Sequence, residues 1–91
     1  MIESKQDATQ LIMLLGGEES ASHLMIATDD MLKTNWTWLP RKIQLLLANL
    51  AHVAGAEPIP ANWSRIDGEV QKKLIYGVNY QLGKAFELVE V

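Results

Sequence analysis

The longest helical pattern in the chain lies in its last third, where apolar residues share one broad face from Ile66 to Leu88. Plotted at 100° per residue, this face covers about half of the helix circumference. A helix with so wide an apolar face has to bury it against several neighbours. The rest of a short chain must therefore supply the elements that cover it.

Two shorter helical patterns occupy the first third of the chain. Residues 4–7 have the form of a capping box, and the pattern behind them stops at Gly16-Gly17, a typical C-terminal stop. The next pattern starts at Glu18 and continues to a cap at Asn35. Its apolar positions step by three and four and are Ala21, Leu24, Met25, Thr28, Met31 and Leu32.

A fourth pattern runs from Pro40 to about Ala54 and ends at Gly55. It is apolar nearly all round, which is typical of a helix buried on several sides. Residues 56–63 form the one long connector, which its prolines bias to an extended path. A second capping box at residues 64–67 is expected to open the last helix.

These patterns predict an all-α protein: a small four-helix bundle-like domain with a short first helix and a long last helix. The length of 91 residues allows one domain, so we expect residues 1–91 to fold as a unit. The sequence has no cysteine, which excludes a disulfide framework, a cysteine-ligated metal and a thiol nucleophile.

Charge argues against a general nucleic-acid binder, because the formal net charge is −3 and the isoelectric point is near 5.2. The distribution is uneven, however. Residues 1–34 are acidic, and residues 35–73 have a small basic excess. A regulatory protein associated with nucleic acid is therefore the alternative hypothesis, with binding through the basic side chains Arg41, Lys42, Arg65, Lys72 and Lys73.

The residues needed for catalysis are scarce. A serine nucleophile would need His23 or His52 as its base, and Ser22 cannot align with His23 because adjacent residues on a helix point about 100° apart. The sequence contains no histidine pair at metal-binding spacing and no calcium loop. We therefore expect a protein that is not an enzyme, with no metal and no cofactor.

Aromatic residues give the clearest sign of a binding surface. Trp36 and Trp38 lie two apart in a predicted turn, and Tyr76 and Tyr80 lie four apart on the polar face of the last helix. Tryptophan and tyrosine are enriched among residues that dominate binding energy at interfaces. All four are therefore candidate partner-binding residues, although a tryptophan that caps the bundle or a tyrosine on a solvated face would explain the pattern equally well.

Three further positions suggest contact with a second copy of the chain. Ile26 and Leu45 are large apolar residues on faces that a four-helix monomer leaves wet, and Gln81 falls near the centre of the apolar arc of the last helix. We expect them at a homodimer interface. Gly77 lies within the same arc, which indicates a close approach of another helix.

No segment resembles a targeting signal, and the longest apolar run, residues 11–15, is far short of the ~20 residues that span a bilayer. The expected function is that of a cytoplasmic, non-enzymatic protein–protein interaction module, homodimeric and without membrane association. Such a module would act as a regulator, adaptor or inhibitor by docking to a protein partner.

Overall fold

Five α-helices and two short 3-10 turns make up the fold in the computed structural model, which describes residues 2–53, 55 and 57–90. No strand occurs in these ranges. The bounds in chain order are α1 (Lys5–Leu14), α2 (Glu18–Ile26), α3 (Thr28–Asn35), η1 (Trp36–Trp38), α4 (Arg41–Leu50), η2 (Trp63–Arg65) and α5 (Gly68–Glu90). The all-α prediction is confirmed, whereas the four-helix bundle is not.

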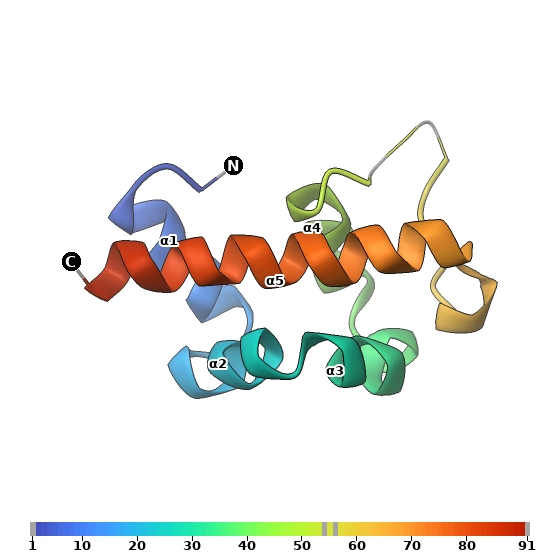
Figure 1. The fold of residues 1–91 in the computed structure, drawn as a ribbon, viewed down its shortest axis with the longest axis horizontal. Helices are drawn as coiled ribbons and strands as arrows, with labels where there is room; N and C mark the ends of the chain where they lie inside the picture. The colour runs from blue at the N-terminus through green and yellow to red at the C-terminus, as the bar shows by residue number, and fades with distance from the viewer. Residues whose placement is uncertain (1, 54, 56, 91) are drawn as a thin grey trace.

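Helix α5 is the central helix of the fold. It contacts each of the other four α-helices, and it crosses most of the width of the view in Figure 1. The molecule measures 38 × 25 × 20 Å. The wide apolar face of α5 is covered in the way its pattern requires, and Leu74, Val78, Leu82 and Ala85 on this face are fully buried.

The predicted helix over residues 18–35 is in fact two helices, broken at Ala27 with φ −121° and ψ 46°. The side chain of Thr28 donates to the carbonyls of Leu24 and Met25 at 2.7 and 3.0 Å. The Asn79 amide of α5 donates to the Met25 carbonyl at 2.7 Å and to the Thr28 hydroxyl at 3.2 Å. A long-range contact with α5 therefore stabilises the break between α2 and α3.

Helix α4 ends at Leu50 rather than near residue 54, and Ala54 itself lies outside the described residues. His52 adopts φ +59° just beyond the helix end. The N–H of His52 donates to the Asn49 carbonyl and that of Val53 to the Ala48 carbonyl, which is the bonding of a Schellman cap. Helix α1 ends with the same pair of hydrogen bonds, donated by Gly16 and Gly17, which both have positive φ. This confirms the prediction that Gly16-Gly17 ends the first helix.

Of the two predicted capping boxes, the first forms by its N-cap bond alone. The Ser4 hydroxyl accepts from the Asp7 N–H at 3.1 Å and opens α1. The box predicted at residues 64–67 is wrong, because Asn62 caps the 3-10 turn η2 instead and α5 begins only at Gly68. The prediction of a close approach at Gly77 is confirmed: a Cβ there would meet the Cβ and Cα of Ala51 at 2.6 and 2.8 Å.

The long connector is fastened to the body of the protein by buried polar groups. The Trp36 indole N–H donates to the Pro60 carbonyl at 3.1 Å. The amide of buried Gln44 donates to the carbonyls of Trp36 at 2.6 Å and Ala61 at 3.0 Å, and its oxygen accepts from Arg41 at 2.9 Å. Residues 59–61 are thereby held against η1 and α4, and Ile59 is buried in the core.

Candidate functional site: an aromatic ridge on α5

The surface of α5 that faces away from the core carries an exposed aromatic pair. The rings of Tyr76 and Tyr80 lie nearly parallel, with 3° between their planes and 6.4 Å between their centroids. Tyr76 is 75% exposed and Tyr80 is 51% exposed. The ammonium of Lys84 lies 5.4 Å from the centre of the Tyr80 ring, within cation–π range.

Helical spacing puts these side chains in one line. Steps of three and four along an α-helix return to the same face, so the exposed residues Glu69, Lys73, Tyr76, Tyr80 and Lys84 form a continuous strip. We call this strip the α5 ridge. The packing of Gly77 on Ala51 fixes the rotation of α5 about its axis and so turns Tyr76 toward solvent.

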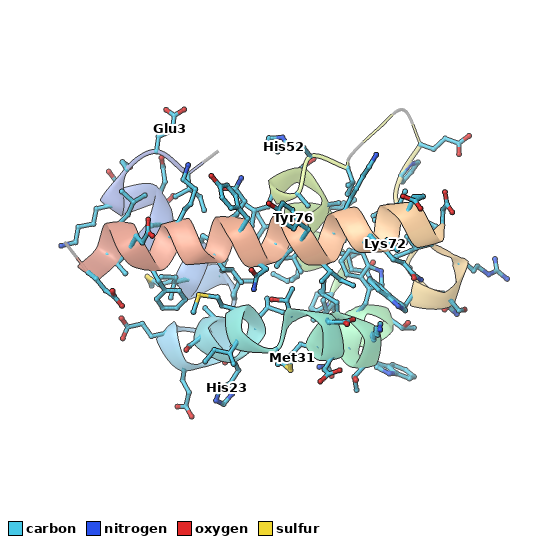
Figure 2. All side chains as sticks on the ribbon, viewed as in Figure 1. Glu3, His23, Met31, His52, Lys72 and Tyr76 are labelled. Atoms are coloured by element: carbon cyan, nitrogen blue, oxygen red, sulfur yellow. The ribbon has the colours of Figure 1, made fainter. Side chains whose placement is uncertain are left out.

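Two hollows flank the ridge, and Tyr76 lines both. The larger one, about 650 Å³, lies between α5 and the α2–α3 junction. Its walls are mixed in chemistry and are formed by Ile26, Ala27, Thr28, Asp29, Asp30, Lys72, Ile75, Tyr76 and Asn79. The smaller one, about 300 Å³, lies between α5 and the end of α4. In Figure 2, His52 of this second hollow lies over the same part of α5 as Tyr76.

Charged groups around the ridge are only partly paired. Lys33 and Asp29 are 3.0 Å apart, and Lys72 and Glu69 are 3.9 Å apart; both pairs are exposed. Within residues 2–53, 55 and 57–90, Lys73 and Lys84 form no ion pair. The two lysines that lie on the ridge itself are therefore available to an acidic group on another molecule.

The two tryptophans predicted to bind a partner have opposite environments. Trp36 is fully buried, and its ring lies 5.9 Å from that of Trp63. Trp36 is therefore a core residue with no surface to offer to a partner. Trp38 is 83% exposed, but it lines neither hollow.

The three residues expected at a homodimer interface are also separated. Ile26 is 74% exposed and lines the larger hollow together with Tyr76. Gln81 lines the smaller hollow, but its own chain already buries it. Leu45 is exposed on α4 and lines neither hollow. The structure thus brings Ile26, Tyr76, Tyr80 and Gln81 together around α5 and leaves Leu45 apart.

Sequence reasoning missed an apolar groove of about 340 Å³ on the other side of the fold. Its lining comes from α1, α2, α3 and α4 and includes Leu14, Leu24, Met31, Leu39 and Ile43. Leu39 lies just before α4 and Ile43 in its first turn, and both are only half-buried. The sequence did indicate such a groove, because the apolar residues of α4 cover more of its circumference than one neighbouring helix can bury.

Within the part of the chain that the structure describes, no group of three or more histidine, aspartate and glutamate side chains is placed to hold a metal ion. None of the described helices combines the length and the apolar character that crossing a bilayer requires. No protein-family model, no curated protein and no solved structure matches this chain.

Proposed function

We propose that this protein is a non-enzymatic docking module that acts by binding another protein through the α5 ridge. The observation that carries the proposal is the exposed, stacked pair Tyr76–Tyr80 between two hollows. Stacking holds both rings in one orientation before binding, so little side-chain entropy is lost when a partner covers them.

The surroundings of the pair also favour a protein partner. Residues that dominate interfaces are most often aromatic side chains next to pockets that a partner fills, and here Tyr76 separates two such hollows. Ile26 adds a large exposed apolar side chain at the edge of the larger hollow. In the cell, such a module would serve as a regulator, adaptor or inhibitor in the cytoplasm.

One observation favours the alternative, binding of single-stranded nucleic acid: bases stack on exposed aromatic rings, and Lys73 and Lys84 flank the tyrosines. Against it, Asp29 and Asp30 form one wall of the larger hollow, where they would repel a phosphate backbone. Only Lys72 and Lys73 of the five basic residues in the middle segment line either hollow.

The test compares partner capture by the wild-type chain and by the double variant Tyr76→Ala/Tyr80→Ala. Both positions are exposed on a helix and alanine favours a helix, so the variant should keep its circular dichroism spectrum. We expect at least roughly a tenfold loss of affinity for the captured protein. The matched control is Gln6→Ala/Gln10→Ala, an exposed pair with the same spacing on α1, which should bind normally.

Equal affinity of wild type and the tyrosine variant for every captured protein would refute docking through the ridge. Capture of an oligonucleotide whose affinity falls steeply with salt and depends on the tyrosines would establish the alternative instead.

A further inference from the structure

We infer that the protein docked on the α5 ridge is a second copy of this chain, paired antiparallel about a twofold axis between Tyr76 and Gly77. The inference rests on the proposed function and specifies the partner. It is carried by the order of charges and rings along the ridge, which is complementary to itself when the two copies run antiparallel.

The ridge is long and open enough for such a contact. From Glu69 to Lys84 it extends about 22 Å at the usual rise per residue. Figure 1 shows α5 crossing the molecule with its near side uncovered, and the ridge residues are exposed. A second helix can therefore lie along it without moving α1 to α4.

In the proposed register, each half of the ridge meets the opposite half of the second copy. Lys84 faces Glu69 of the second copy, and by symmetry Glu69 faces its Lys84, which gives two ion pairs. Lys73 faces Tyr80 in the same way, which gives two cation–π contacts. The two Tyr76 rings meet near the axis, so every ridge residue has a complementary counterpart.

Two other arrangements place like charges together. An antiparallel pair centred on Val78 would set Glu69 against Glu87 and Lys72 against Lys84. A parallel twofold pair would set every residue against itself, lysine on lysine and glutamate on glutamate. Since like charges in contact oppose association, the charge order excludes these two arrangements.

A register centred on Tyr80 would set Lys73 against Glu87, also of opposite charge. The register centred between Tyr76 and Gly77 is preferred because it places Tyr76, the more exposed ring and the one that lines both hollows, at the axis.

A charge-swap experiment tests this register directly. Sedimentation equilibrium from about 10 μM to about 1 mM, a range suited to a weak interface, should show a dimer for the wild type. Lys84→Glu and Glu69→Lys should each dimerise at least tenfold more weakly, because each places two like-charged pairs in its homodimer. An equimolar mixture of these two variants should regain wild-type affinity as a heterodimer, in which both pairs are again of opposite charge.

A second measurement uses the absence of cysteine from the sequence, so that a single introduced thiol can form a disulfide only between two copies. Tyr76→Cys should cross-link rapidly under mild oxidation, because the two side chains meet near the axis. Gln10→Cys, at an exposed position of α1, is the control and should cross-link only slowly.

Two results would overturn the inference: a wild-type chain that stays monomeric at about 1 mM, or a mixture of the charge variants that does not regain the dimer. Either result leaves the proposed function intact if another protein is captured through Tyr76 and Tyr80. Conversely, a dimer that is restored by the mixture while no other protein binds identifies the second copy as the occupant of the ridge.

Discussion

Gln44 shows how one polar side chain can hold a long connector. It is buried and uses both ends of its amide, since its nitrogen donates to the carbonyls of Trp36 and Ala61 and its oxygen accepts from Arg41. A buried amide is tolerated only when its partners are present. The connector is therefore ordered by hydrogen bonds in addition to apolar contacts.

Replacing this amide should weaken the fold. We expect Gln44→Leu to lower the free energy of unfolding by about 2 kcal/mol, because the carbonyls of Trp36 and Ala61 both lose the Gln44 donor, and the bond to Trp36 is buried. Urea denaturation measures the change. Gln10→Leu makes the same chemical change at an exposed site and should shift stability by less than about 0.5 kcal/mol. Equal effects of the two variants would contradict a bonding role for Gln44.

His52 is the one described non-glycine residue with positive φ, at +59°. A side chain in the left-handed region costs roughly 1–2 kcal/mol, which glycine avoids. His52→Gly should therefore raise the free energy of unfolding by about 1 kcal/mol, as measured by thermal and urea denaturation. His52→Ala keeps the steric cost and should give no such gain, and a gain of similar size with alanine would show that backbone conformation is not the cause.

At the scale of the elements, the contact between α4 and α5 depends on a single missing side chain. Gly77→Ala should destabilise the protein by about 1–3 kcal/mol, because the new Cβ would lie 2.6 Å from the Ala51 Cβ and 2.8 Å from its Cα. Gly83→Ala on the same helix meets no atom within 4 Å and should stabilise by about 0.5–1 kcal/mol. Denaturation midpoints measure both, and stabilisation by both variants would contradict the close approach.

The existence of the helices could be predicted from local pattern, but the break at Ala27 could not. Alanine is a good helix former, and the apolar stepping continues across it from Met25 to Thr28. The break is held by Asn79, which lies 51 residues beyond Thr28 in the sequence. A contact of that range leaves no local trace. The end of α4 at His52 is made by local hydrogen bonds, but it places histidine in the left-handed region that glycine favours, so the pattern indicates Gly55 instead.

The candidate site could also be predicted only in part, because some of its residues lie in a periodic pattern and others do not. The four-residue spacing of Tyr76 and Tyr80 on the polar side of a long helix is sufficient to place them outside. Trp36 and Trp38 lie in a turn that has no periodicity to assign a face, so the sequence could not tell that the first enters the core and the second faces solvent. The hollows depend on α2, α3 and α4 meeting α5, which only the folded chain shows.

For the whole molecule, the position of α5 predicts a single cooperative unfolding transition. Each of the other four helices packs against α5, so the loss of α5 would disturb the packing of all of them. Unfolding followed by far-ultraviolet circular dichroism and by tryptophan fluorescence should give one midpoint. Trp38→Phe serves as a control, because it removes the emission of an exposed indole and leaves that of buried Trp36 and half-buried Trp63. Two separate midpoints would show that part of the fold is independent.

The close approach at Gly77 also has a consequence for how this sequence can vary in evolution. Exchanging Ala51 for glycine would remove one obstructing atom, but its Cα would still lie 2.8 Å from any Cβ at position 77. No single compensating change at position 51 therefore removes the cost of a side chain there. Divergent proteins that keep this arrangement of helices should retain glycine at this point of the last helix, even where the ridge residues have drifted beyond recognition.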